Sequence, residues 1–421
     1  MSLFPNAITG IILNLNLLEE TLRQGRIPTR YSDHGTQYYS ADGKSPFAFK
    51  KFGHNSFSTQ TARTSTIELI EKAIDIHEKS ILLDGLAPMY KDFNEGYFHS
   101  LKSGHIAAVH LTIPNGECFN MSQVVLEMAT WFRRLKNFEP SRMRLVTTAK
   151  EIREAKDDGA ISVILGSQSA GFLGLDLSSL DFFARLGIRT MQPTYQLRNQ
   201  FGSGCGEKKD EGLSNLGVQW VERMNELGMV ISLSHVGYKT STDVMETSKD
   251  PVVFDHSNPK ALCNHIRNIT DDQIKTCAEK GGVIGLCPLA MFLSPDKKPA
   301  ELGVEDYVNH IDYVVNLVGV DHAGIGLDHT EQGFTTPEKI IEDRRLFPGL
   351  TSKHIQDIED QFLKSGRDRL YDYEVYTPWL KSVSETPIIT EALLRRGYSE
   401  QDVGKILGEN FLRVFERVWG G

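Results

Sequence analysis

Short apolar runs alternate with amphipathic segments along most of the chain, and this alternation predicts an α/β fold. Eight runs are rich in β-branched and other apolar residues and are bounded by turn-forming residues, as buried strands are. The segments between them have helical periodicity; 216–227 places Val221 and Met224 on one face, and 271–280 opens with two aspartates, which favour a helix start. The strand candidates are 80–84, 106–112, 161–166, 188–193, 229–234, 251–255, 282–286 and 322–327.

Eight strand–helix alternations are typical of a (β/α)8 barrel rather than a doubly wound sheet. No Gly-x-Gly-x-x-Gly follows the first strand, so the main argument for a dinucleotide fold is missing. We expect residues 1–65 to form an irregular extension that wraps the domain or joins a partner subunit. The barrel then occupies 66–421, with a charged insertion at 330–385 and two closing helices in 387–419, the second beginning at the capping signal of Ser399.

Three polar residues follow strand candidates at their carboxyl ends. His235 and His256 end the runs at 229–234 and 251–255, and Asp328 ends the run at 322–327. In α/β enzymes this end of a parallel sheet or barrel holds the chemistry. Two imidazoles and a carboxylate converging there indicate a metal-assisted hydrolase site.

Structural roles are the alternative for each of these residues. A single histidine after a strand is more often hydrogen-bonded for structure than bound to a metal, and Asp328 is also a suitable helix N-cap. Spacing alone therefore leaves the metal site and the structural interpretation evenly matched.

Composition and net charge limit the classes of molecule that the chain is expected to bind. A net charge of −9 and a pI near 5.8, without long Lys/Arg clusters, argue against a nucleic-acid surface and favour a small polar substrate. Five cysteines without a CxxC pair favour reduced thiols in a cytoplasmic enzyme. The first apolar stretch lacks a basic flank and is interrupted by Asn14 and Asn16, and no run is long enough for a membrane span, so we expect neither a signal peptide nor an anchor.

Several long motifs resemble the renal (membrane) dipeptidase family, peptidase family M19. They occur in the order and at the spacing of that family between about 81 and 328, and the similarity continues weakly to the C-terminus. The motifs are EGLSNLG at 211–217, MNELGMVISLSHV at 224–236, PVVFDHSNPKAL at 251–262, HIRNITDD at 265–272, GGVIG at 281–285 and DHAGIGLD at 321–328.

The resemblance implies a (β/α)8 barrel of the metal-dependent amidohydrolase type that cleaves dipeptides and related amides, usually with two zinc ions bridged by a glutamate. By position, His235 and His256 match ligands of the second metal, and Asp328 matches the carboxylate that orients or deprotonates the attacking water. Arg267 matches the arginine that receives the substrate carboxylate, a role suited to a planar, always-charged fork.

The first-metal half of the family's site is altered, which suggests an atypical branch. Where the family has Asp-Gly-His-x-Asp, this chain has Leu86 and Pro88, which cannot bind a metal. The bridging glutamate corresponds to Gln168, a weaker ligand, and a substrate-contacting histidine corresponds to Tyr195. We therefore expect at most one zinc, and His110, near the end of the second strand, is a candidate replacement ligand.

The leading functional hypothesis is a mononuclear metal-dependent hydrolase of the membrane dipeptidase type, acting on an amide or dipeptide bond in a small carboxylate-bearing substrate. Asp328 would move the proton, Arg267 would bind the carboxylate, and Tyr195 would stabilise the oxyanion or orient the substrate. The alternatives are a metal-dependent lyase, isomerase or redox enzyme acting on an amino-acid-derived molecule, and a pseudo-enzyme. A homodimer is a candidate assembly.

Overall fold

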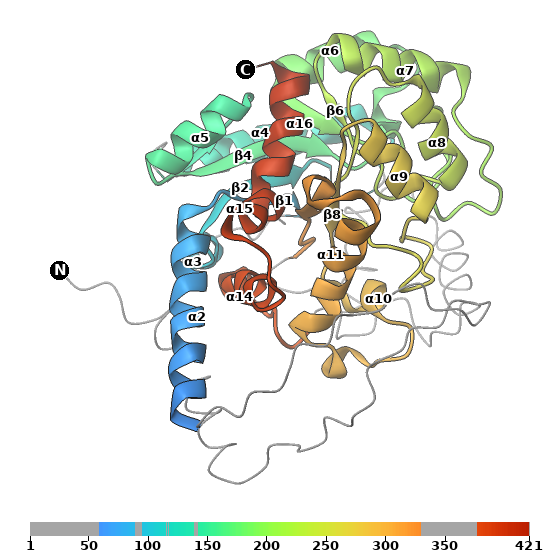
Figure 1. The fold of residues 1–421 in the computed structure, drawn as a ribbon. Coiled ribbons are helices and arrows are strands. Elements are labelled where there is room, and N and C mark those ends of the chain that lie inside the picture. Colours follow the sequence, from blue (N-terminus) through green and yellow to red (C-terminus); the bar gives the residue numbers. More distant parts are fainter. Residues whose placement is uncertain are drawn as a thin grey trace, which may run out of the picture. The chain divides into compact units, whose positions relative to one another are not determined.

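Nine strands form around a common centre in the computed structural model, which describes residues 59–88, 95–114, 116, 118–138, 142–329 and 377–420. All eight strand candidates form strands, although several are shorter than their apolar runs (Figure 1). The apolar pattern does not predict the ninth strand, β3, because this strand is only three residues long and has Arg144 at its centre. The strands are β1 (Leu82–Ala87), β2 (Ile106–Thr112), β3 (Met143–Leu145), β4 (Ile161–Ser167), β5 (Ile188–Met191), β6 (Val230–Ile231), β7 (Val253–Phe254), β8 (Val283–Leu286) and β9 (Ala323–Ile325).

Every strand pair in the described part of the chain is parallel. One ladder has the order β1-β2-β4-β5-β6, with β3 beside β4, and a second has the order β7-β8-β9. A parallel bridge between Ser232 and Val253 links the two ladders. The Asp328 amide donates to the Leu86 carbonyl at 3.0 Å, which brings the end of β9 back to β1. The expected (β/α)8 barrel of the amidohydrolase type is confirmed.

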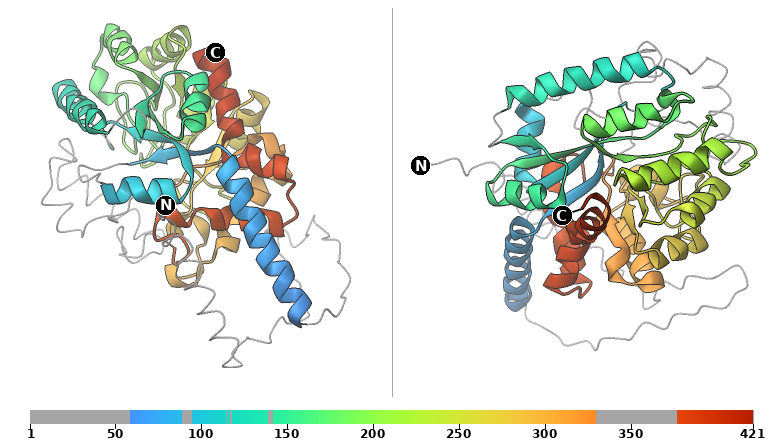
Figure 2. Two further views of the ribbon diagram at one scale, coloured as in Figure 1. Left: turned by 90° about the vertical axis from the view of Figure 1, so that its left-hand side faces the viewer. Right: turned by 90° about the horizontal axis from the view of Figure 1, so that it is seen from above.

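Helices follow the strands along the chain and surround them (Figure 2). Side-chain caps fix several starts: the Ser214 hydroxyl accepts from the Gly217 amide before α7, and Thr270 and Gln273 form a capping box at α9. The helices are α2 (Thr59–Lys79), α3 (Glu95–Ser103), α4 (Met121–Asn137), α5 (Ala149–Asp157), α6 (Ser178–Arg185), α7 (Asn215–Glu226), α8 (Tyr238–Thr247), α9 (Asp271–Glu279), α10 (Ala290–Leu293), α11 (Val304–Val318), α14 (Pro387–Arg395), α15 (Glu400–Gly404) and α16 (Asn410–Trp419).

The ends of the chain differ in part from the expected boundaries. Helix α2 begins at Thr59, inside the segment that we expect to be irregular. The sequence pattern does not predict this start, because the Thr-rich first residues of the helix lack a periodic arrangement of apolar residues. Residues 1–58, and most of the expected insertion (330–376), lie outside the described residues. The closing helices form as expected, with Ser399 capping α15 and a π-helical turn (Lys405–Glu409) joining α15 to α16.

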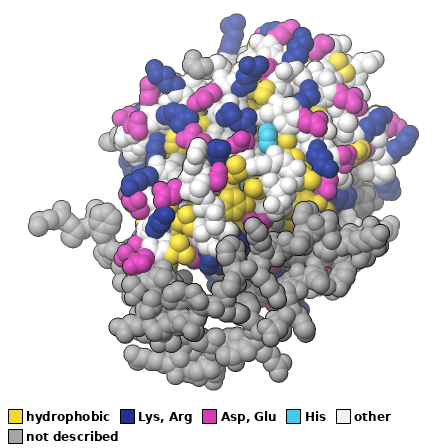
Figure 3. Space-filling view, viewed as in Figure 1, with side chains coloured by type: hydrophobic (Ala, Val, Ile, Leu, Met, Phe, Trp, Pro, Cys, Tyr) yellow, Lys and Arg dark blue, Asp and Glu magenta, His cyan; other side chains and the backbone are white. Residues whose placement is uncertain are grey.

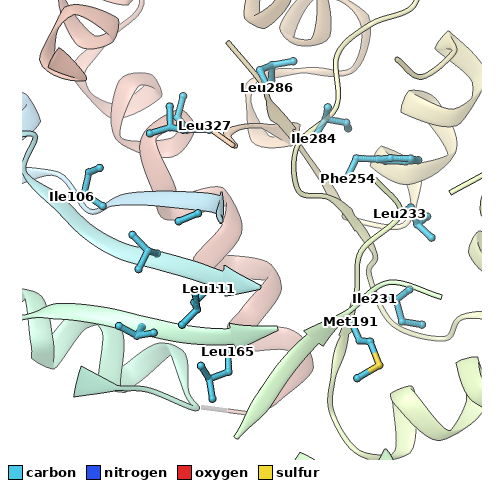
Figure 4. Packing of buried hydrophobic residues seen from close by; sticks show 14 of the residues in the cluster. Ile106, Leu111, Leu165, Met191, Ile231, Leu233, Phe254, Ile284, Leu286 and Leu327 are labelled. Atoms are coloured by element: carbon cyan, nitrogen blue, oxygen red, sulfur yellow. The ribbon is translucent and has the colours of Figure 1, made fainter. Parts of the chain in front are cut away.

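Alternating strand residues divide the core into two clusters. Leu83, Ile164 and Val253 belong to a cluster that also includes Phe411 of α16. Their neighbours along the strands belong to a second cluster formed with residues of the surrounding helices, and Figure 4 shows some of them, including Leu165 and Phe254, distributed along the strands. Because side chains alternate along a strand, the smaller cluster is the barrel interior and the larger one is the layer between strands and helices.

Helix α16 closes the amino-terminal end of the barrel. Its Arg413 side chain donates to the carbonyls of Gly281 and Asp321, which lie just before β8 and β9. The Phe411 ring packs against Gly85, Gly285 and Gly324. A Cβ atom added to any of these glycines would lie within about 3 Å of the ring, so only glycine leaves enough space for it. Helix α16 therefore covers the amino-terminal ends of the strands and leaves their carboxyl ends uncovered.

The surface is mixed in charge. Figure 3 shows acidic and basic side chains interspersed over one face of the described residues, without a large basic patch on that face. Within the described ranges, no helix combines the length and the apolarity needed to cross a bilayer.

Candidate active site

Two imidazoles and a carboxamide converge at the carboxyl end of the barrel. The Nε2 atoms of His235, after β6, and His256, after β7, are 2.9 Å apart. The Gln168 Nε2 atom, directly after β4, is 3.3 Å from both. All three side chains are buried. Burial, and then the positive charge of Arg267, hold the pKa of His235 well below its usual range, so its ring is neutral and suited to bind a cation.

Asp255 fixes the orientation of His256. Its Oδ1 atom accepts a hydrogen bond from His256 Nδ1 at 2.7 Å. That contact places the proton on Nδ1 and leaves the Nε2 lone pair directed toward His235. Burial alone would raise the pKa of Asp255, but the contact with His256 brings it down to about 2, so the carboxylate is anionic.

His235 is held by its backbone and by Tyr195. Its φ of 68° lies in the left-handed region, and its carbonyl accepts from the Cys205 amide at 2.7 Å. The half-buried Tyr195 ring, from the loop after β5, stacks on the imidazole with ring centroids 3.9 Å apart. Strained non-glycine backbone is frequent at functional sites, where the surroundings enforce it. The Tyr195 ring therefore lies directly against one of the two convergent imidazoles.

Arg267 and Asp328 lie beside the imidazole pair. The Arg267 guanidinium is buried, donates to the His256 carbonyl at 3.2 Å and lies over the Phe292 ring. In the described part of the chain, no ion pair includes Arg267. Asp328 has a φ of 48°. Burial raises the pKa of its carboxyl group, and the positive charge of Arg267 opposes that rise. A carboxylate with a raised pKa near a cationic fork is suited to proton transfer.

His110 faces the barrel interior but does not join the imidazole pair. Its Nδ1 atom is 2.7 Å from the Gly85 carbonyl and 3.6 Å from Asp255 Oδ2. Its Nε2 atom lies against Gly166, where an added Cβ would be 1.8 Å away. The structure therefore places this candidate replacement ligand behind Asp255.

The end of β1 has two side chains that cannot bind a metal. Leu86 and Pro88 are buried, and the neighbouring Asp84 carboxylate accepts from the amides of Leu86 at 3.1 Å and Leu327 at 2.7 Å. Asp84 thus holds β1 against the end of β9. Burial raises the pKa of Asp84 well above its usual range, as expected for a carboxyl group enclosed in the barrel wall.

Few donor side chains lie close enough together to hold a divalent cation. Among the described residues, no group of three or more His, Cys, Asp or Glu side chains could hold a metal ion. The donors are therefore the two convergent imidazoles and, after rotation of its carboxamide, the Gln168 oxygen. Two histidines and one oxygen ligand leave a coordination position for water or substrate.

Asp255 is the residue that sequence reasoning missed. The apolar pattern makes it the last residue of a strand candidate, although a carboxylate directly before a candidate ligand histidine is a detectable signal. The contact with His256 depends on the turn after β7, which the sequence pattern does not specify.

The sequence and the fold are similar to those of known proteins. A family model described as membrane dipeptidase (peptidase family M19) matches residues 70–363 and 371–419. The dipeptidase tcpJ of Claviceps purpurea is 28% identical over 288 residues, which is 68% of this chain but only 58% of that protein's length.

Among solved structures, an amidohydrolase from Pseudomonas aeruginosa is 31% identical with a TM-score of 0.70, covering 83% of this chain and 99% of the other. A metallo peptidase from Rhodobacter sphaeroides, liganded with a phosphinate mimic of a dipeptide, has the same fold, with a TM-score of 0.65 at 23% identity over 81% of this chain and all of the other. The family model spans most of the chain, and the chain belongs to the membrane dipeptidase family of metallopeptidases.

Proposed function

We propose that this chain is a single-metal hydrolase that cleaves an amide or dipeptide bond in a small carboxylate-bearing substrate. The observation that supports this most directly is the 2.9 Å approach of the His235 and His256 Nε2 atoms at the carboxyl end of the barrel. The family is one of metallopeptidases, and a curated relative is named a dipeptidase. A divalent metal, with zinc as the expected ion, lowers the pKa of a bound water and polarises a carbonyl.

The remaining residues have separable roles in this proposal. Arg267 binds the substrate carboxylate, because its buried guanidinium has donors left after its bond to the His256 carbonyl. Asp328 accepts a proton from the attacking water and delivers it to the leaving amine. Tyr195, stacked on His235, directs its hydroxyl to the carbonyl oxygen or to the backbone of the substrate.

The test is a substrate panel combined with metal analysis. Purified protein, with and without added Zn²⁺, is incubated with dipeptides and N-acyl amino acids, and released amino acid is quantified. Hydrolysis that is lost in His235→Ala and His256→Ala, but kept in the control His99→Ala on the exposed face of α3, supports the proposal.

A carboxylate substrate that is converted without hydrolysis would favour the lyase, isomerase or redox alternative. Absence of any turnover and of metal binding would favour the pseudo-enzyme. The cytoplasmic location and the homodimer stay predictions from the sequence.

A further inference from the structure

The proposed metal ligands are all neutral. His235 and His256 are imidazoles, and the side chain of Gln168 is an uncharged carboxamide. A divalent cation enclosed by neutral donors inside a protein is stabilised less than one with an anionic ligand, because burial removes the screening of bulk water. An anion in the next layer of residues would offset part of that deficit.

Asp255 is the carboxylate in contact with a proposed ligand. Its Oδ1 atom is 2.7 Å from His256 Nδ1, and its Oδ2 atom is 3.6 Å from His110 Nδ1. His110 is itself anchored, because its Nδ1 atom is 2.7 Å from the Gly85 carbonyl. The side chains form a row from β2 to β7: His110, Asp255, His256, and then the metal position.

The barrel wall is shaped around this row. A Cβ on Gly166 would lie 1.8 Å from His110 Nε2, so β4 has room for that imidazole only as glycine. A Cβ on Gly285 or Gly326 would lie 2.2 or 1.9 Å from the Asp255 carbonyl. Glycines on β4 and β8 and directly after β9 therefore allow His110 and the Asp255 backbone to pack at this depth, an observation independent of the hydrogen bonds.

We propose that Asp255, supported by His110, is a positioning residue that supplies the anionic charge missing from the metal ligands and increases the affinity of the site for a single divalent cation. This inference rests on the proposed function of the same site. Asp255 contacts no substrate; it acts through His256, whose Nδ1 proton it fixes so that Nε2 always presents a lone pair. Partners of this kind typically change metal affinity by about 10–100-fold.

The experiment is a Co²⁺ titration of the metal-free full-length protein, with the dissociation constant and the visible absorption spectrum as readouts. Asp255→Asn keeps the shape and an acceptor oxygen but removes the charge. We expect its affinity to be about 10–100-fold weaker, with a shifted absorption band. His110→Asn should weaken the affinity to a smaller extent, because Asp255 and its charge stay in place.

Asp84→Asn is the control for a substitution at a buried acidic side chain, since the contacts of Asp84 are to backbone amides. The Co²⁺ affinity of this variant should equal that of the unchanged protein. If the unchanged protein binds no Co²⁺, the proposed function fails. If it binds and Asp255→Asn binds equally tightly, the inference about Asp255 is wrong.

A measurement without substitution covers the case in which Asp255→Asn does not fold. In the NMR spectrum of the unchanged protein, His256 should show an Nδ1-bound proton in a strong hydrogen bond and an unprotonated Nε2. A proton on Nε2 in the metal-free protein at neutral pH would overturn the assigned role.

Discussion

Replacement of Arg267 by Met should weaken binding of carboxylate substrates while leaving the turnover rate nearly unchanged. The guanidinium is buried and donates to the His256 carbonyl. A bidentate contact to a carboxylate adds two charge-assisted hydrogen bonds of about 1.5 kcal/mol or more each. The loss is thus at least about 3 kcal/mol, which corresponds to roughly 100-fold in kcat/KM and should appear mainly in KM.

The assay compares each substrate with its carboxamide analogue, which lacks the anion. The unchanged enzyme should lose roughly 100-fold between the two, whereas Arg267→Met should treat them almost alike. Arg267→Lys keeps the charge but not the planar fork, so its preference for the carboxylate substrate should be intermediate between those of the unchanged enzyme and Arg267→Met. If KM for the carboxylate substrate is unchanged in Arg267→Met, or if both substrates lose equally, the arginine has a structural role and the reasoning fails.

Three further predictions follow from the site and the core. Elemental analysis should find at most one metal per chain; His235→Ala should abolish metal binding, and Gln168→Glu should strengthen it by adding an anionic ligand. Phe411→Ala should lower the free energy of unfolding by about 3–5 kcal/mol in denaturant titrations, because its ring fills the closed end of the barrel. Unfolding free energy should fall as the pH drops from about 6.5 to about 4, because burial lowers the pKa of His77 to about 4 and the unfolded chain binds the proton first.

Control variants and contradicting outcomes distinguish these specific effects from a general loss of stability. Two tightly bound metals per chain would show that other residues rebuild the first site. Trimming of the exposed Phe182 to Ala should cost much less than the change at Phe411, since its side chain is already largely in water. In His77→Gln, the acid-dependent loss should shrink by up to about 3 kcal/mol. An unchanged pH slope would mean that His77 does not contribute.

The sequence by itself determined the order of the elements and the end of the barrel where the chemistry lies. Apolar runs and caps are local signals, so the eight barrel strands and helices such as α7 and α9 could be predicted from them. The positions of His235, His256 and Asp328 after strands followed from the same pattern. The losses at Leu86, Pro88 and Gln168 are also visible in the sequence, because they are substitutions in recognisable motifs.

Only the tertiary structure decided which side chains meet across the barrel. Strand alternation left the direction of His110 open, and closure of the barrel placed it behind Asp255 and against Gly166. The roles of Asp255 beside His256 and of Asp84 between β1 and β9 also depend on contacts between distant segments. The physical reason is that the relative stagger of the strands is set by packing of the whole barrel, and a local hydrophobic pattern contains no information about that stagger.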